Sequence, residues 1–583
     1  MMKRYRGWTC ALSLLLFASA CQHEPEQNGA SSLRNPVAAE LPVTPLEIAP
    51  NQKPPAAPSA AEPAASGGAV MARQKMDDSA AVAAPNGLRV RRAFPAGASV
   101  TASPPAPADS VHFNTEAYAA TEEIPFLAAK DSPISTFSID VDTASYSNVR
   151  RFLREHQLPP EGAVRVEELI NYFPYAYAEP KGDAPFSLST ELSTAPWAPA
   201  HRLLHVGLQA KHIAIGQLPP RNLVFLLDVS GSMNEPNKLP LVKRSLATLT
   251  DTLTERDQIA IVVYAGASGL VLPPTTGDQH AAIRAALERL EAGGGTNGAG
   301  GIELAYEQAQ HMARPGSMNR VVLATDGDFN VGVTSQSALF TLISEKRKSH
   351  VFLSVLGFGM GNYKDSMLEM LADKGNGNYA YIDTLAEARK VLVAEGGATL
   401  STLAKDVKLQ LEFNPQKVGA YRLIGYEDRQ LAARDFNDDT KDAGELGAGQ
   451  SVTALYEIVP PGLAVDSGQV DALRYQQPAA PSPGHTRELC TLKARYKAPN
   501  SEQSQLLEQV VQDSAQALTA TSPSFRFAAA VAAFGMTLRH SPARGSSSFD
   551  LARQLAEDAL GPDPEGYRHE FSSLVDAARS LAH

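Results

Sequence analysis

The strongest constraint on the fold is a regular alternation of short apolar runs and amphipathic stretches between residues 221 and 395. The apolar runs have strand length and lie at 222–228, 258–264, 320–326, 351–357 and 378–382. Helical patterns follow near 238–254, 279–291, 299–313, 336–348 and 365–373. Because apolar strands that alternate with helices build a sheet covered on both faces, the sequence predicts an α/β domain with a doubly wound, mostly parallel sheet over 221–396.

Five short polar side chains stand where loops leave the carboxyl ends of these predicted strands: Asp228, Ser230, Ser232, Thr296 and Asp326. The first three form Asp-x-Ser-x-Ser directly after one apolar run, Thr296 follows three glycines, and Asp326 closes another run. Loops at the carboxyl ends of parallel strands share one edge of the sheet, so these side chains are expected to meet. Hydroxyl and carboxylate oxygens are the ligands of hard cations, which predicts a divalent metal site.

Helix capping by Asp228 or Ser230 is the structural alternative for this motif, since both residue types favour the position before a helix. Capping accounts for one Asp-x-Ser-x-Ser but leaves Thr296 and Asp326, on two later loops, without a reason. Metal binding accounts for all of these residues together, and we therefore predict a metal site.

The set resembles the metal-ion-dependent adhesion site of von Willebrand factor type A domains, whose five ligand positions are all occupied here. The resemblance implies that Ser230, Ser232 and Thr296 contact the ion directly or conditionally, whereas Asp228 and Asp326 act largely through water. It also implies an open coordination position for a carboxylate of a partner protein. Mg²⁺ suits such a site because it takes oxygen ligands in octahedral geometry and keeps waters; Mn²⁺ and Ca²⁺ are alternatives.

The N-terminus has the pattern of a secretory signal, with a basic head and an apolar stretch at 8–20 that is too short to span a bilayer. It ends in Ala-Ser-Ala-Cys21, which resembles a bacterial lipobox, although that motif more often has Leu at the position of Ala18. The resemblance implies cleavage before Cys21 and fatty-acid (palmitate) modification there, as in lipoproteins. A plain signal peptide cut near Ala20 is the alternative. By resemblance to bacterial sorting rules, Gln22 in place of Asp favours transfer to the outer membrane.

Composition limits the partners and the covalent chemistry. A chain of 583 residues is too long for one ordinary core, so several domains are expected. A net charge of −11 and a pI of about 5.7 argue against a nucleic-acid partner. Of the three cysteines, Cys10 leaves with the signal and Cys21 is assigned to lipid, so no intrachain disulfide is expected. Cys490 lies in an alternating stretch and is expected to be a buried strand residue.

The pattern changes along the chain predict six segments. They are a signal (1–20), a disordered Ala- and Pro-rich tether (21–110), an N-terminal α/β region (111–220), the α/β domain (221–396), a β-rich domain (397–500) and a C-terminal helical region (501–583). The helical pattern of the last segment starts with Leu506, Leu507, Val510 and Val511. One hypothesis is that strands before the α/β domain complete the β-rich domain, which would make the α/β domain an insertion in a sandwich.

Longer strings outside the metal motif resemble a narrower family. Residues 137–150 read Phe-Ser-Ile-Asp-Val-Asp-Thr-Ala-Ser-Tyr-Ser-Asn-Val-Arg, and residues 163–173 read Ala-Val-Arg-Val-Glu-Glu-Leu-Ile-Asn-Tyr-Phe. Together with 324–332 and 356–365, they are similar to YfbK-like von Willebrand factor A lipoproteins. The resemblance implies a Rossmann-like von Willebrand factor A domain flanked by a sandwich-like β-rich domain and a C-terminal helical region.

Other site motifs are incomplete. Gly357, Gly359 and Gly361 follow a predicted strand, but Asn362 stands where a dinucleotide fingerprint needs glycine, so tight turns are expected instead. The sequence contains no His-Glu-x-x-His zinc helix and no nucleophile elbow around a serine. No histidine that could act as a general base stands near the metal motif in sequence. We therefore expect neither an enzyme nor a small-molecule substrate.

The function that these features favour is a membrane-anchored envelope lipoprotein that binds protein partners through a Mg²⁺-dependent adhesion site. One alternative is a structural envelope protein whose metal only fixes the strand-end loops. Another is a metal-dependent hydrolase. Partner affinity that survives chelation would favour the structural protein, whereas turnover of any substrate would favour the hydrolase.

Overall fold

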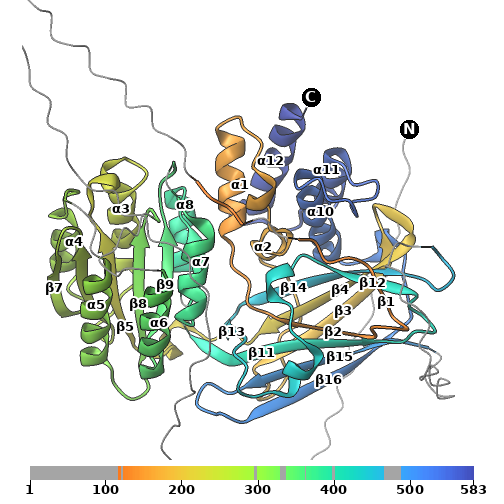
Figure 1. The fold of residues 1–583 in the computed structure, drawn as a ribbon, viewed down its shortest axis with the longest axis horizontal. Coiled ribbons are helices and arrows are strands. Elements are labelled where there is room, and N and C mark those ends of the chain that lie inside the picture. Colours follow the sequence, from red (N-terminus) through yellow and green to blue (C-terminus); the bar gives the residue numbers. More distant parts are fainter. Residues whose placement is uncertain are drawn as a thin grey trace, which may run out of the picture. The chain divides into compact units, whose positions relative to one another are not determined.

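The computed structural model describes residues 116–119, 122–294, 298–327, 336–361, 363–396, 401–464 and 487–582 (Figure 1). All of them fall within the folded unit Pro105–His583. The predicted signal, the tether and Cys21 lie outside the described residues, and so does Thr296. In the described part of the chain, no helix combines the length and the apolarity that a membrane span needs.

Six strands form one sheet in the order β10-β9-β8-β5-β6-β7. Their bounds are β5 Arg221–Asp228, β6 Gln258–Tyr264, β7 Ser268–Thr276, β8 Met318–Thr325, β9 Phe352–Gly357 and β10 Tyr379–Tyr381. Every neighbouring pair is parallel except β6 and β7, which confirms the predicted mostly parallel sheet. Strand β7 was not predicted because it contains Gly269 and two prolines, and proline is confined to the edge strands of a sheet.

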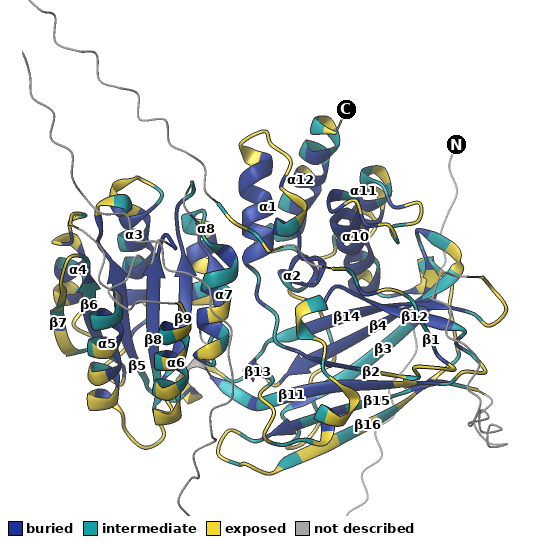
Figure 2. Cartoon of the chain, in the orientation of Figure 1, coloured by how far each residue is buried: buried dark blue, intermediate teal, exposed yellow. Residues whose placement is uncertain are grey.

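Helices cover both faces of this sheet (Figures 1 and 2). They are α3 Leu239–Thr250, α4 His280–Glu288, α5 Gly298–Met312, α6 Gln336–Lys346, α7 Asp365–Lys374 and α8 Leu385–Arg389, which continues as a π-helix, Lys390–Ala394. Strand β5 contributes to two hydrophobic cores, with Phe225 in the core that includes α3 and Leu226 in the core that includes α5. Burial on both faces explains the uninterrupted apolar run of β5.

Two further sheets share one hydrophobic core and form a sandwich. One sheet has the order β1-β12-β14-β4-β3, and the other has the order β13-β11-β15-β16 with β2 paired to β11. The bounds are β1 Leu127–Ala128, β2 Ile134–Ser138, β3 Phe186–Ala195, β4 Ala198–Ala210, β11 Thr402–Phe413, β12 Ala420–Ile424, β13 Gly444–Gly447, β14 Ser451–Val459, β15 Glu488–Lys497 and β16 Ser504–Gln512. Because β4 pairs with β14, strands from both sides of the α/β domain complete the sandwich, as hypothesised.

The helical pattern predicted from residue 501 onward is wrong for Ser504–Gln512, which form strand β16. The pairs Leu506–Leu507 and Val510–Val511 suit helical spacing, but they also suit an edge strand with one covered face. Antiparallel pairing with β15 buries Val511 and leaves Leu506 exposed. The local pattern fits both a helix and a strand, and pairing with β15 decides in favour of the strand.

A group of helices packs around one further core. They are α1 Ala144–Arg154, α2 Val166–Asn171, α10 Pro523–Leu538, α11 Phe549–Glu557 and α12 Tyr567–Leu581. Most of α10 is buried, which fits its alanine-rich sequence because small side chains let neighbouring elements approach closely. Short 3₁₀ turns lie at Glu161–Ala163, Ile215–Gln217, Gly231–Asn234, Arg347–Ser349, Glu427–Arg429, Ala433–Asn437 and Leu518–Ala520.

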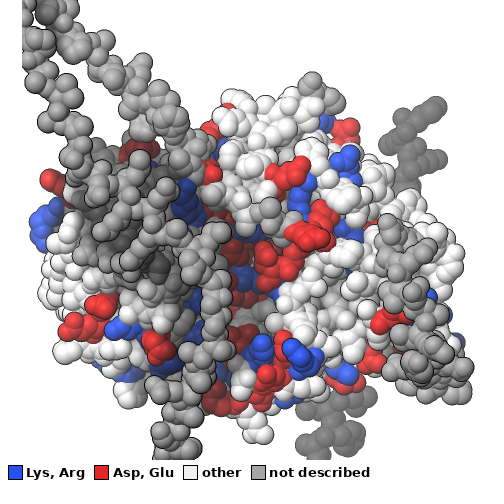
Figure 3. Space-filling model, in the orientation of Figure 1, with Lys and Arg blue, Asp and Glu red and all other residues white. Residues whose placement is uncertain are grey.

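Buried and half-buried ion pairs connect α7 of the α/β domain to the rest of the molecule. Arg165, just before α2, lies 2.8 Å from Asp365, and Arg429, after β12, lies 2.9 Å from Asp373. Both arginines also lie 2.9 Å from Glu369. Burial raises the pKa of Glu369 to about 8, although the two arginines oppose the rise. Acidic side chains gather with a few basic ones in the middle of the face shown in Figure 3.

Candidate metal centre

The Asp-x-Ser-x-Ser loop leaves the carboxyl end of β5. Asp228 is the last residue of that strand and is fully buried. Its Oδ1 accepts the backbone N–H of Ser230 at 2.9 Å, and the hydroxyl oxygens of Ser230 and Ser232 lie 3.1 Å apart. No side-chain cap is made to the 3₁₀ turn Gly231–Asn234, and α3 begins only at Leu239, so helix capping does not explain the motif.

The second carboxylate oxygen of Asp228 is held by the strands on either side of β5. Oδ2 accepts the hydroxyl of Tyr264, at the end of β6, at 3.1 Å and that of Thr325, at the end of β8, at 3.2 Å. Burial raises the pKa of the Asp228 carboxyl; the hydrogen bonds from Ser230 oppose the rise, and nearby Asp326 adds to it. Tyr264 and Thr325 were not predicted as site residues, since their only sequence signal is that they end the neighbouring strands.

Asp326 directly follows β8, the parallel neighbour of β5, and is fully buried. The structure therefore places Asp228 and Asp326 at the carboxyl ends of adjacent strands. Nζ of Lys238 lies 3.2 Å from Oδ2 of Asp326, and this lysine side chain is only 3% exposed. Lys238 was not predicted as a site residue. Its position at the start of α3 was a usable signal, because the helix dipole disfavours a cation there.

The glycine loop that leads to Thr296 lies against the Asp-x-Ser-x-Ser loop. The N–H of Gly293 donates to the carbonyl of Val229 at 2.8 Å, and the N–H of Gly231 donates to the carbonyl of Gly294 at 3.2 Å. Gly294 has a φ of +83°, a left-handed conformation that favours glycine. Thr296 lies outside the described residues, so its predicted role as a ligand stays a prediction.

The donors of this site suit a hard divalent cation. Ser230 and Ser232 offer hydroxyl oxygens, and Asp228 and Asp326 offer carboxylate oxygens, which are the ligand types of Mg²⁺. Over the described ranges, no three His, Cys, Asp or Glu side chains gather as a metal site, so the fit rests on this mixed set. With Thr296 these residues would hold the ion, and the bound ion would offer an open position to an anionic oxygen.

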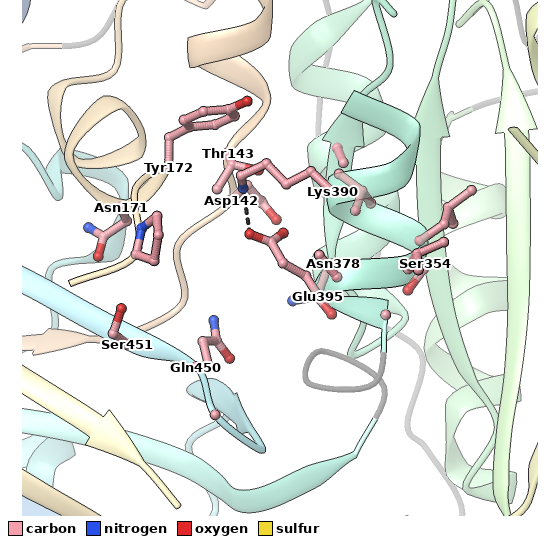
Figure 4. Close-up of a pocket in the computed structure, with 18 of the residues that line it drawn as sticks. Asp142, Thr143, Asn171, Tyr172, Ser354, Asn378, Lys390, Glu395, Gln450 and Ser451 are labelled. Atoms are coloured by element: carbon pink, nitrogen blue, oxygen red, sulfur yellow. Dashed lines mark hydrogen bonds and ion pairs between the residues drawn. The ribbon is translucent and has the colours of Figure 1, made fainter. Parts of the chain in front are cut away.

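A separate cavity of about 430 Å³ lies among the end of the α/β domain, the N-terminal region and the sandwich (Figure 4). Nζ of Lys390 points toward Glu395 and lies 2.5 Å from its Oε1; it also lies 4.1 Å from the ring centre of Tyr172. None of the described candidate metal ligands lines this cavity. Its volume falls within the range of small-ligand pockets, about 300–1,000 Å³. The absence of a small-molecule ligand therefore stays a prediction.

The sequence also gave expectations for the glycines after β9 and for Cys490. Gly359 and Gly361, after β9, have φ values of +78° and +88°, left-handed conformations that favour glycine, whereas Gly357 is the last residue of β9. Cys490 is a buried residue of β15, as predicted, and burial raises the pKa of its thiol to about 12. A thiol held neutral in this way is a packing residue and a poor nucleophile.

Three family models match the chain. One described as von Willebrand factor matches residues 112–205, and one described as von Willebrand factor type A domain matches residues 223–328. The third, described as Uncharacterized protein YfbK, C-terminal, matches residues 398–581. The α/β domain of the structure thus corresponds to a von Willebrand factor A domain.

Individual proteins are similar to this chain to different extents. Inter-alpha-trypsin inhibitor heavy chain H4 of Homo sapiens is 29% identical over 161 residues, 26% of this chain and 17% of that protein. The solved structure of a von Willebrand factor type A protein from Catenulispora acidiphila is 16% identical, with 76% of this chain and 89% of that chain covered and a TM-score of 0.35. Uncharacterized protein YfbK of Escherichia coli (strain K12) is 45% identical over 473 residues, 80% of this chain and 81% of that protein. The chain therefore belongs to the family of YfbK-like proteins with a von Willebrand factor A domain.

Proposed function

We propose that this protein binds protein partners through a divalent ion, Mg²⁺, held by the loops after β5 and β8 and by Thr296. The von Willebrand factor A domain indicates protein interaction. The observation that carries the proposal is the pair of hydroxyls of Ser230 and Ser232, 3.1 Å apart, in the loop that directly follows the buried carboxylate of Asp228.

The charge of the site supports recognition of a carboxylate. Lys238 offsets one of the two negative charges of Asp228 and Asp326. A divalent ion added to this set leaves the site with excess positive charge, and a bound cation is often the largest charge in its site. A carboxylate from a partner protein would balance that excess at the open coordination position.

Binding rather than hydrolysis is favoured by the way the carboxylates are engaged. Asp228 accepts hydrogen bonds from Ser230, Tyr264 and Thr325, and Asp326 is paired with Lys238. Both carboxylates are fully buried. A general base must reach the proton that it removes, directly or through one water, so neither carboxylate is well placed for this task.

Replacing Thr296 by Ala is expected to weaken partner capture more than Mg²⁺ binding. One neutral hydroxyl can be replaced by water, which Mg²⁺ retains readily, so the loss of ion affinity should be small. The loss of capture should be larger because the ion would no longer face the partner carboxylate in the same geometry. Calorimetric Mg²⁺ titration and Mg²⁺-dependent pull-down from membranes of the native host measure the two effects.

Thr276→Ala is the matched control, since this threonine is an exposed residue at the end of β7. The control should leave both measurements unchanged. If ion affinity and capture fall together in Thr296→Ala, or if neither changes, a structural metal becomes the better explanation. Capture that persists in the presence of a chelator leads to the same conclusion.

We further propose that the protein is anchored in the outer membrane through a lipid on Cys21. Cys21→Ser is expected to release it from the membrane fraction, because serine cannot carry the thioether-linked lipid. Cys10→Ser is the control and should remain bound, since Cys10 lies within the predicted signal. Fractionation followed by immunoblotting decides, and retention of the Cys21→Ser variant in membranes would point to an uncleaved anchor.

A further inference from the structure

A lysine stands at the candidate metal centre where ligands alone were expected. Lys238 is the residue before α3, and its ammonium lies 3.2 Å from Oδ2 of Asp326 and 3.6 Å from Oε1 of Glu235. The lysine side chain is 3% exposed and the Asp326 side chain 0%, whereas Glu235 is 46% exposed. The close and buried pair is therefore Lys238 with Asp326.

The loop after β9 leaves space for the aliphatic part of the Lys238 side chain. A Cβ placed on Gly359, in the loop after β9, would lie 2.4 Å from Cε and 2.7 Å from Cγ of Lys238. The glycine thus leaves the space along which the lysine side chain passes toward Asp326. The carbonyl of Gly359 is fixed by the hydroxyl of Tyr381 at 2.6 Å. Because space is left for its side chain, Lys238 is held in place more firmly than a surface lysine.

Lys238 places a positive charge beside two buried carboxylates. Asp228 and Asp326 are both fully buried, and nearby Asp326 adds to the cost of charging Asp228. Buried charges are stable only when they are paired or bind a metal. Lys238 lies within ion-pair distance of Asp326 and can balance the charge of this carboxylate.

We propose that Lys238 is a tethered counter-ion of the metal site, which holds Asp326 in the metal-free protein and competes with the divalent ion for this carboxylate. The inference rests on the proposed function, since it concerns the same site. Lys238 lowers the affinity of the site for the divalent ion, and it keeps the domain folded when no ion is bound. An additional carboxylate from a partner offsets the positive charge that the ion and Lys238 share, so metal and partner bind cooperatively.

The test uses Lys238→Met in the full-length protein. Methionine is unbranched and flexible, so it can follow the same path past Gly359 without the charge. The Kd for Mg²⁺, measured by calorimetry, is expected to fall about tenfold, the lower end of the effect of groups next to metal ligands. The metal-free melting temperature should also fall, and saturating Mg²⁺ should raise it more than in the wild type, as ligand linkage requires.

Two further variants make the outcome specific. Lys238→Gln removes the same charge with a different side chain and decides the result if the Met variant does not fold. Arg244→Met is the control, because Arg244 is an exposed residue of α3 and loses the same charge at the surface. The control should bind Mg²⁺ as the wild type does.

The outcomes separate this inference from the function on which it rests. If the wild type binds Mg²⁺ and both variants at position 238 bind it equally or more weakly, the counter-ion role is wrong and the metal site remains. If no protein in the set binds Mg²⁺, both proposals are wrong. If only the variants at position 238 bind Mg²⁺, Lys238 blocks the site, which supports the counter-ion role and overturns the proposed function.

Discussion

Replacing Arg150 by Met is expected to lower the free energy of unfolding by about 3–5 kcal/mol, the usual cost of leaving buried charges without their partner. Arg150, in α1, lies 2.7 Å from Glu387 in α8 and 3.1 Å from Glu570 in α12, and it also pairs with Asp383. The side chains of Arg150 and Glu387 are 3% and 1% exposed. Urea denaturation followed through the fluorescence of buried Trp197 measures the loss.

Arg154→Met is the matched control from the same helix. The Arg154 side chain is 49% exposed and pairs with Glu570, so its loss should cost less than about 1 kcal/mol. Similar urea midpoints for the two variants would mean that the buried pairs of Arg150 do not hold α1 to the last helix of the von Willebrand factor A domain. A large loss for Arg150→Met alone supports that connection.

Replacing Asp228 by Asn is expected to weaken Mg²⁺ binding about 10- to 100-fold, the range found when a group that acts next to metal ligands is changed. The variant removes one negative charge from the site and keeps a carbonyl oxygen that can accept a hydrogen bond. Calorimetric titration of Mg²⁺ measures the change. Asn is the better substitution here than Ala, since Ala would leave the buried hydroxyls of Tyr264 and Thr325 without their acceptor.

Asp251→Asn controls for the change in net charge, because Asp251 follows α3 and its side chain is 59% exposed. It should bind Mg²⁺ with wild-type affinity. Unchanged affinity in Asp228→Asn, with the wild type binding measurably, would remove Asp228 from the metal site. Its role would then be limited to holding the loop through Ser230, Tyr264 and Thr325.

The parts of the fold that were predictable are those in which one local pattern has one structural solution. The run 223–227 is apolar at every position, which indicates a strand buried on both faces, and β5 is buried in this way. Asp228 and Asp326 could be placed at one edge because parallel strands share their carboxyl ends. Motif spacing and strand polarity were sufficient for these residues.

Other features depend on contacts that spacing does not reveal. Residues 504–512 carry a pattern compatible with a helix, and only β15 makes them a strand. The last helix of the α/β domain, α8, is short and passes into a π-helix, so it lacks a long periodic signature. Lys238 reaches Asp326 because Gly359, more than a hundred residues later, leaves room for it. Such long-range contacts are set by packing rather than by local sequence.

The most direct test of the metal site is a crystal structure of the protein grown with Mn²⁺, whose anomalous scattering locates the ion. The account predicts one Mn²⁺ at the loop after β5, bound by the hydroxyl oxygens of Ser230 and Ser232 at about 2.1 Å, a distance typical of octahedral oxygen ligation. Asp228 and Asp326 should face the ion through water. A structure with no ion at this edge, or with Mn²⁺ only at other residues while Lys238 still pairs with Asp326, would contradict the metal-dependent binding function.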